Sequence, residues 1–262
     1  MKPLSQMPEH EAKGLRGILF DLDDTLLDDG LLTEEAYRAL FRLARAGLRL
    51  LAVTGRPSGY GEVMARQWPI DGVVTENGAI AVYREGSALG RWQRADETTR
   101  RARRVRIAEA FATLRSRFPE VRASDDSHAR TSDLALDIGE SQRVPVDVVA
   151  RIEAEVRALG LRTFVSSVHL HITLDPFDKA SGAAAFLWER HGEDPTAVRH
   201  AYAFIGDSAN DAACFNAFAS TFGVANVASS LPLLSVPPRY VAGAAKGAGF
   251  AEISDRILQL RG

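Results

Sequence analysis

Short apolar runs that end in polar or glycine-containing turns recur in the first and last parts of the chain. They cover residues 17–23 (GILFDLD), 48–55 (LRLLAVTG), 201–208 (AYAFIGDS) and 221–226 (TFGVAN). Continuous apolar runs of this kind are typical of strands that are buried on both faces. Amphipathic patterns lie between them, such as the stripe over residues 37–44, which Thr33 is placed to cap and Gly47 to end. Strands that alternate with helices predict an α/β domain whose parallel sheet is covered on both faces.

The middle of the chain has a different pattern. Helical stripes over residues 107–118 and 148–156 accompany three strand-like runs, which are residues 132–138 (SDLALDI), 161–167 (LRTFVSS) and 168–174 (VHLHITL). Polar and apolar residues alternate along these runs. Such alternation indicates a sheet with one covered face and one open face.

The length of 262 residues suits two domains of ordinary size. We therefore expect a smaller α+β domain over residues 84–175, inserted into a core domain that is formed by residues 15–83 and 176–262. Residues 1–14 are too polar for a signal peptide and are expected to form a flexible tail.

Charge and composition narrow the class of protein. The formal net charge is −2, and no run approaches the roughly 18 apolar residues that a membrane span requires. The basic run at residues 100–106 (RRARRVR) fits the solvated face of a helix better than a nucleic-acid site. The single cysteine, Cys214, excludes an intramolecular disulfide and is expected to be a buried thiol. These features favour a cytoplasmic protein with no nucleic-acid or membrane partner.

Candidate ligand groups follow the predicted strands, at the positions where an open parallel sheet binds its ligands. They are Asp21, Asp23, Thr54, Gly55, Lys179, Asp207, Asn210 and Asp211. Each segment alone also fits a structural role, such as an Asx turn, an ordinary loop, a surface lysine or a helix cap. Together they predict one site, because all lie at strand or helix ends and their chemistry is complementary. The crowded carboxylates suit a hard divalent cation, and Mg²⁺ takes oxygen ligands from carboxylates, water and phosphate.

These residues resemble the motifs of the haloacid dehalogenase (HAD) superfamily of phosphotransferases. The pattern D-x-D-x-T … T … K … G-D-x-x-x-D matches residues 21–25, 54, 179 and 206–211. The insertion looks like the superfamily's second cap class, C2. Residues 75–83 (TENGAIAVY) resemble the N-G-A segment of the IIB, or Cof-like, subclass, which includes sucrose-phosphate and mannosyl-3-phosphoglycerate phosphatases. The resemblance implies a HAD-like Rossmannoid core with a parallel sheet and an inserted α+β cap of type C2.

The resemblance also implies a function, that of a Mg²⁺-dependent phosphatase which forms an aspartyl phosphate. Asp21 is expected to be the nucleophile and Asp23 the general acid and base. The phosphoryl group is expected to be bound by Thr54, Gly55, Lys179 and Asn210. Mg²⁺ is expected to be held by Asp21, Asp23 and Asp207, with Asp211 behind them. The expected substrate is a sugar phosphate or a similar small phosphorylated metabolite.

Two other functions remain open at this point. A phosphomutase of the phosphomannomutase type uses the same aspartyl phosphate and requires a bisphosphate activator. A phosphate-binding or phosphoacceptor module, such as a response-regulator receiver, also clusters Asp, Thr and Lys, but its usual size of about one small domain fits this length poorly. Two sequence details depart from the subclass: Asp24 occupies a position where many members carry Gly, and residues 179–182 (KASG) replace a frequent Lys-Gly pair.

Two histidines in the inserted domain are candidates for substrate contact. In residues 167–174 (SVHLHITL), alternation places His169, His171 and Thr173 on one face of a strand, opposite the apolar face. This face is either the exposed polar face of a half-covered sheet or the roof of the catalytic pocket. In a roof, the imidazoles bind substrate hydroxyls or, when protonated, a second anionic group.

Overall fold

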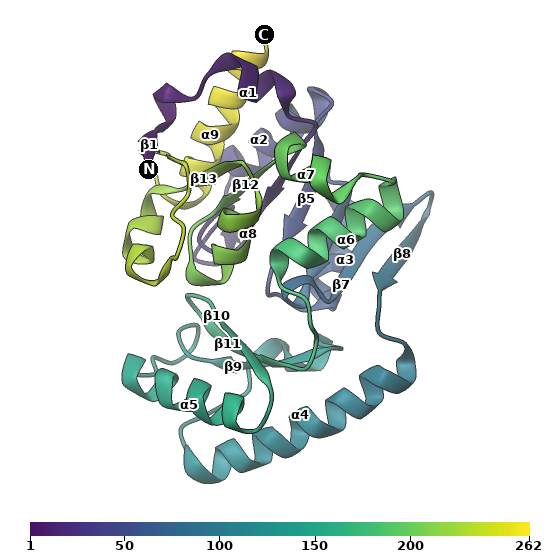
Figure 1. The fold of residues 1–262 in the computed structure, drawn as a ribbon, viewed down its shortest axis with the longest axis vertical. Helices are drawn as coiled ribbons and strands as arrows, with labels where there is room; N and C mark the ends of the chain where they lie inside the picture. The colour runs from purple at the N-terminus through teal and green to yellow at the C-terminus, as the bar shows by residue number, and fades with distance from the viewer.

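The computed structural model describes residues 1–262 as a core domain and a smaller cap domain (Figure 1). A nine-stranded sheet runs through the core domain in the order β1-β14-β13-β12-β2-β5-β6-β7-β8. In that order the strands are β1 (Lys2–Pro3), β14 (Tyr240–Val241), β13 (Ser220–Gly223), β12 (Tyr202–Gly206), β2 (Gly17–Phe20), β5 (Arg49–Val53), β6 (Gly72–Thr75), β7 (Ile80–Glu85) and β8 (Ala88–Gln93). All pairs from β1 to β6 are parallel, and β7 and β8 add antiparallel strands at one edge.

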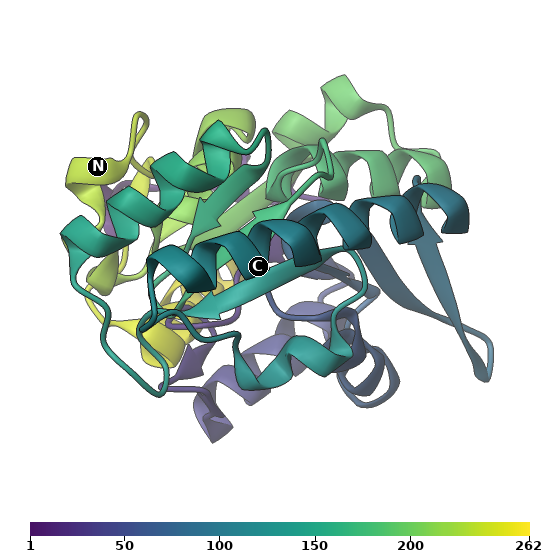
Figure 2. The same ribbon diagram turned by 90° about the horizontal axis from the view of Figure 1, so that it is seen from below.

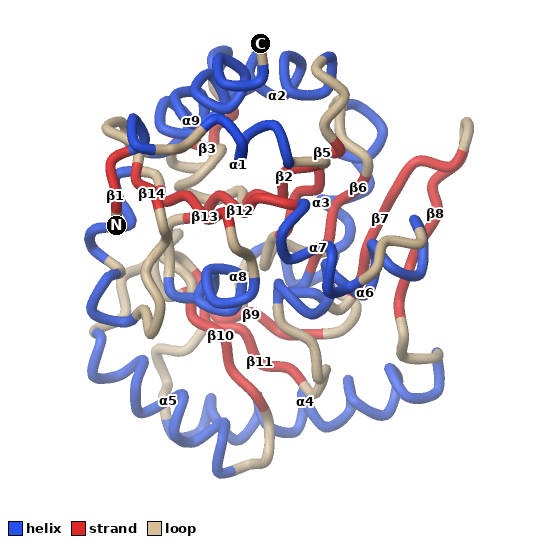
Figure 3. Tube along the Cα trace, turned by 45° about the horizontal axis from the view of Figure 1, so that its top comes forward, coloured by secondary structure: helices blue, strands red, loops and turns tan.

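Helices cover both faces of this sheet (Figure 3). One layer comprises α1 (Glu9–Gly14), α2 (Glu34–Arg45), α3 (Ser58–Gln67) and α9 (Lys246–Arg261), and the other comprises α6 (Lys179–His191), α7 (Pro195–Ala201) and α8 (Ala212–Ala217). Successive residues of a strand point to opposite layers, so Ile18 and Phe20 of β2 pack with the first layer and Leu19 with the second. Cys214 is buried in the second layer, as expected. The apolar runs therefore form strands that are buried on both faces.

The cap domain consists of a three-stranded antiparallel sheet and two helices. The sheet order is β10-β11-β9, with β9 (Asp133–Asp137), β10 (Arg162–Val165) and β11 (His169–Thr173). The helices α4 (Glu97–Arg117) and α5 (Val146–Ala158) lie on the side of this sheet that faces away from the core domain (Figures 1 and 2). Apolar residues of both helices, such as Leu114 and Ile152, pack with Leu170 and Ile172 of β11. The other face of the sheet is directed toward the core domain.

Short elements complete the structure. Two small strands, β3 (Leu27–Asp28) and β4 (Leu31–Leu32), pair as a hairpin. Single turns of 3₁₀ helix are η1 (Leu4–Gln6), η2 (Glu76–Gly78), η3 (Asp125–Ala129), η4 (Ala209–Asp211), η5 (Ala225–Ser229) and η6 (Leu231–Leu233).

The N-terminal segment differs from the prediction of a flexible tail over residues 1–14. Strand β1 pairs with β14, and α1 packs against α9. Three apolar side chains in this otherwise polar segment, Leu4, Met7 and Ala12, are buried in the main core cluster. Their burial is enough to tie the segment to the domain.

The start of the cap also differs from the predicted boundary at residue 84. The hairpin of β7 and β8 extends the core sheet as far as Gln93, and Trp92 is buried in the core. The inserted domain therefore begins only after β8. The predicted fold class itself, an α/β core with a mainly parallel sheet and an inserted α+β cap, is confirmed. Among the helices, none combines the length and the apolar character that crossing a membrane requires.

Candidate active site

Three adjacent strands bring the predicted site residues to one edge of the core sheet. Asp21 follows β2, Thr54 follows β5 and Asp207 follows β12. The strands are parallel, so their carboxyl ends meet, and the backbone N–H of Asp21 donates to the carbonyl of Ile205 at 2.9 Å. Because every residue of β2 is apolar and buried, Asp21 is the first functional side chain at this edge.

Lys179 reaches the same edge from the first turn of α6. The preceding residue, Asp178, caps the helix by accepting a hydrogen bond from the backbone N–H of Ser181. Gly78 of η2 packs directly on this cap: its φ is +105°, and a Cβ there would lie 2.1 Å from the carbonyl oxygen of Asp178. Only glycine permits this approach. The N-G-A segment therefore positions the start of the helix that carries Lys179.

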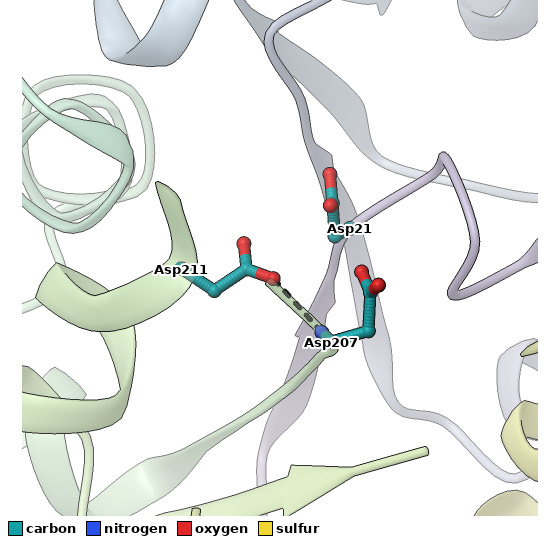
Figure 4. A group of neighbouring side chains, drawn as sticks. All are labelled: Asp21, Asp207 and Asp211. Carbon is teal, nitrogen blue, oxygen red and sulfur yellow. Dashed lines mark hydrogen bonds between the residues drawn. The ribbon is translucent and has the colours of Figure 1, made fainter. Parts of the chain in front are cut away.

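Asp21, Asp207 and Asp211 form a buried acidic cluster (Figure 4). One carboxylate oxygen from each lies within 4.8 Å of the others. The ammonium group of Lys179 joins the cluster, at 2.8 Å from Asp21 Oδ1 and 2.7 Å from Asp211 Oδ1. The structure thus brings these four predicted residues together.

The cluster is short of positive charge. Burial, together with the nearby Asp211, raises the pKa of Asp21 to about 7 although Lys179 opposes the shift. Burial, together with the carboxylates of Asp211 and Asp21, raises the pKa of Asp207 to about 8. Burial alone would lower the pKa of Lys179, but Asp21 and Asp211 raise it above its ordinary value, so this side chain stays charged. One ammonium group does not balance three buried carboxylates.

This donor set fits a divalent cation such as Mg²⁺, because it consists of oxygen atoms only and carries excess negative charge. The three carboxylates are not equivalent. Asp211 Oδ1 accepts from Lys179, while Oδ2 accepts from the backbone N–H groups of Asp207 and Ser208. Asp211 is therefore well placed to orient Lys179 and the loop, and Asp21 and Asp207 are the better ligands.

Asp23 is held by a residue that the sequence reading did not select. The guanidinium group of Arg56 donates from Nε and Nη2 to the Asp23 carboxylate at distances of 2.8–3.1 Å. The adjacent Asp24 points elsewhere and pairs with Lys246 at 3.2 Å. Its φ of +56° explains why Gly is suitable at this position, and Asp is among the few residues that tolerate it.

The remaining predicted phosphate ligands lie at different depths. Thr54 is completely buried, and its hydroxyl accepts from the backbone N–H of Arg56. Gly55 and Asn210 line a small polar cavity beside Asp21 and Asp23. A Cβ on Gly55 would lie 2.8 Å from His171 Nε2, so glycine is needed for the cap to approach. The structure therefore places Gly55 and Asn210 at the cavity, whereas Thr54 is not among the residues that line it.

The cap is closed over the cavity by buried polar contacts. Glu76 accepts hydrogen bonds from the backbone and hydroxyl groups of Thr131 and Ser132 in the cap, and from the backbone of Ser58 in the core. Arg130 of the cap donates to the carbonyl of Gly55 at 3.0 Å. The cavity between cap and core measures about 10 Å³ and has no apolar lining residue. It has room for about one water molecule.

The two cap histidines are buried, and the alternative of a solvent-exposed polar face is wrong. His169 and His171 are 2% and 1% exposed, because their face of β11 lies against the core domain, and both line the small polar cavity. His169 Nε2 lies 2.9 Å from Glu140 Oε2, and His171 Nδ1 lies 3.0 Å from Asp133 Oδ2.

Several functional candidates were missed by the sequence reading. They are Arg56, Glu76, Arg130, Asp133, Glu140 and Asn226. Three of them had a local indication: Arg56 directly follows Thr54 and Gly55, Glu76 lies in the N-G-A segment, and Asn226 ends the apolar run at residues 221–226. Asn226 donates to Asp207 Oδ2 at 3.0 Å from a distant loop, a contact that no local pattern reveals.

Comparisons with known proteins concern the family and the fold of this chain. Residues 18–99 match the family model of haloacid dehalogenase-like hydrolases. No curated protein sequence matches the chain. Among solved structures, a Thermoplasma acidophilum protein is similar with a TM-score of 0.71 at 19% identity, covering 94% of this chain and 99% of its own.

Two further solved structures share the fold. The sucrose-phosphatase of Synechocystis, in complex with sucrose and phosphate, has a TM-score of 0.65 at 15% identity, covering 94% of this chain and 98% of its own. A haloacid dehalogenase-like hydrolase from B. subtilis has a TM-score of 0.63 at 17% identity, with coverages of 92% and 99%. The family match over residues 18–99 and the shared fold together confirm the predicted resemblance of this chain to the haloacid dehalogenase-like hydrolases.

Proposed function

We propose that the protein is a Mg²⁺-dependent phosphomonoester hydrolase that acts through an aspartyl phosphate. The observation that supports this proposal is the buried group of Asp21, Lys179 and Asp207 beside Asp23, at one edge of the sheet. It combines a nucleophile, a fixed positive charge, a cation site and a general acid around one small cavity, which Asp21 and Asp23 line. Phosphoryl transfer requires little more than this combination of positioning and charge.

In the first half of the reaction, a carboxylate oxygen of Asp21 attacks the phosphorus atom. The bond between phosphorus and the leaving-group oxygen breaks, and protonated Asp23 gives its proton to that oxygen. Lys179 stabilises the negative charge on the phosphoryl oxygens. Asp21, Asp207 and the main-chain carbonyl of Asp23 would hold Mg²⁺, which would supply further positive charge.

In the second half, the Asp23 carboxylate takes a proton from water. The water oxygen attacks phosphorus, the bond from phosphorus to Asp21 breaks, and inorganic phosphate leaves. Asp21 is again a carboxylate and Asp23 is again protonated, so the cycle is complete. Arg56 orients Asp23 in both halves through its paired hydrogen bonds.

The proposed substrate is a sugar phosphate or a similar small phosphorylated metabolite. The wholly polar lining of the cavity favours a leaving group that carries hydroxyl groups. The sucrose-phosphatase with the same fold binds sucrose and phosphate, which supports the same class of substrate here. Because the closed cavity is far smaller than any sugar phosphate, the cap has to move away from the core to admit substrate.

The test is a screen of phosphate monoesters in the presence of Mg²⁺ that measures released phosphate. We expect turnover of at least one sugar phosphate by the wild-type protein. The Asp21→Asn variant keeps the size of the side chain but removes the attacking charge, so it should lose essentially all turnover while remaining folded. Wild-type-like activity in this variant would end the aspartyl-phosphate proposal, and so would the absence of phosphate release from every ester.

A further inference from the structure

Each of the two cap histidines in the cavity is bound to a carboxylate. His171 uses Nδ1 toward Asp133, and His169 uses Nε2 toward Glu140. An ionised carboxylate only accepts hydrogen bonds, so these two ring nitrogens carry the protons. The opposite nitrogens, His171 Nε2 and His169 Nδ1, are then free to act as acceptors as long as the rings are neutral.

The surroundings keep both rings neutral. Burial lowers the pKa of His171 to about 4, although the Asp133 carboxylate opposes this shift. Burial also lowers the pKa of His169, and the guanidinium groups of Arg130 and Arg56 add to the effect. At neutral pH the two histidines therefore present acceptors and no positive charge to the cavity.

Unpaired polar groups lie next to His171 Nε2. This nitrogen lies 2.8 Å from the position that a Cβ on Gly55 would occupy, and Asn77 Nδ2 lies 3.3 Å from the same position. Asn77 is 2% exposed, and neither atom of its amide has a hydrogen-bond partner. A buried amide without a partner indicates a ligand or a water molecule that completes its hydrogen bonds.

The cavity offers no free cation for a second anionic group. Its lining contains no lysine or arginine. Around the cavity, four carboxylates pair with two guanidinium groups; the residues are Asp23, Asp126, Asp133, Glu140, Arg56 and Arg130. Both guanidinium groups are already paired with carboxylates, Arg56 with those of three residues and Arg130 with those of two. A phosphate or carboxylate on the leaving group would therefore face excess negative charge without a partner.

We propose that His171 and His169, oriented by Asp133 and Glu140, are specificity-determining acceptors for hydroxyl groups of an uncharged leaving group. The proposal rests on the proposed phosphatase function and narrows its substrates to esters with a single anionic group. It disfavours the phosphomutase alternative, whose activator carries two phosphates. Of the two roles considered for the histidines, it favours binding of substrate hydroxyls over binding of a second anionic group.

The experiment compares matched pairs of esters with the Mg²⁺-loaded protein. Glucose 6-phosphate is paired with glucose 1,6-bisphosphate, and glycerol 3-phosphate with 3-phosphoglycerate. We expect the member of each pair with one anionic group to have a higher kcat/KM, by about tenfold or more, than the member with two anionic groups. A preference for the doubly anionic member in both pairs would overturn the proposal.

Variants of His171 provide the second arm. His171→Ala should lower kcat/KM for the better sugar ester by at least about tenfold and change hydrolysis of p-nitrophenyl phosphate little, since that ester has no hydroxyl groups. His171→Lys should shift the preference toward the doubly anionic esters. Asp133→Asn removes the carboxylate that keeps the proton on His171 Nδ1. It should therefore lower kcat/KM for the sugar ester in the same way as His171→Ala. His128→Ala is the matched control, because His128 is an exposed histidine of the cap.

The outcomes separate the two proposals. If p-nitrophenyl phosphate is hydrolysed and His171→Ala leaves the sugar ester unaffected, the phosphatase function stands and the histidine proposal is wrong. If no ester is hydrolysed, the phosphatase proposal fails, and calorimetric binding of the same pairs to the Asp21→Asn variant then decides the histidine proposal. Equal or tighter binding of the doubly anionic members would overturn it.

Discussion

Arg56 forms a bidentate pair with the carboxylate of Asp23, with Nε at 3.0 Å from Oδ2 and Nη2 at 2.8 Å from Oδ1. The Nη2 atom of the same guanidinium group also donates to Glu140 of the cap at 2.9 Å. A paired geometry of this kind restricts the orientation of a carboxylate much more than a single contact. The proposed general acid is therefore positioned by a core residue that also binds the cap, through Glu140.

Replacing Arg56 by lysine tests this positioning role. Lysine keeps the charge but not the planar pair of donors, so we expect Arg56→Lys to lower kcat by about tenfold or more with little change in KM. The loss should be larger for an alkyl phosphate than for p-nitrophenyl phosphate, because only the alkoxide leaving group needs a proton from Asp23. Arg38→Lys, at an exposed surface pair, is the control. Equal losses with both esters would contradict a role through Asp23.

Asp23 and Asp24 are adjacent but should behave very differently. Asp23→Asn removes the general acid and should lower the rate by roughly 10²–10⁴-fold. Asp24→Asn should cost far less, because Asp24 faces Lys246 and not the cavity, and Asn also tolerates its positive φ. Steady-state kinetics of the two variants with one substrate measure the difference. Similar losses at the two positions would mean that the acid has been misassigned.

Metal binding should stabilise the protein more at higher pH. The pKa values of Asp21 and Asp207 in the folded protein are raised to about 7 and about 8, whereas an unfolded Asp titrates near about 3.9. The folded, metal-free protein therefore holds extra protons between these limits, and its stability falls as the pH rises through that window. Mg²⁺ replaces those protons.

In EDTA, we expect Tm to fall between about pH 6 and about pH 8, and Mg²⁺ to raise Tm more at the upper pH. Mg²⁺ should also restore activity after EDTA, whereas Ca²⁺, with its larger coordination shell, should not. Differential scanning fluorimetry at the two pH values and a phosphate-release assay provide the measurements. An equal increase in Tm with Mg²⁺ at both pH values, or full activity in EDTA, would show that the acidic cluster is not the metal site.

Glu76 should contribute strongly to stability and cap closure. It is 3% exposed and accepts hydrogen bonds from donors on three residues, Ser58, Thr131 and Ser132. Glu76→Gln places an amide donor among these donors, so we expect a loss of about 1–3 kcal/mol in the free energy of unfolding. Chemical denaturation checks this, with Glu62→Gln, a more exposed residue of α3, as control. Equal stabilities of the two variants would show that the Glu76 contacts are unimportant.

The sequence by itself determined the core architecture and the acidic part of the site. Apolar runs and helical stripes are local patterns, so β2, β5 and β12 and the helices between them follow from nearby residues. Parallel strands share a carboxyl edge, and this rule predicts that Asp21, Thr54 and Asp207 lie at the same edge of the sheet, although their strands are shown to be adjacent only by the structure. The left-handed turn at Asp24 and the tight packing of Gly78 were not evident, because backbone angles and distant contacts are not visible in a pattern.

Only the tertiary structure decided how the cap and core meet. Arg56 lies 33 residues from Asp23 and 84 from Glu140, and His171 lies 38 residues from Asp133. No periodicity relates residues so far apart, and their pairing depends on how one domain closes on the other. The same reason applies to residues 1–14, whose few apolar side chains gain stability only against α9 and β14. The charge state of the cap histidines likewise depends on burial that only the closed structure provides.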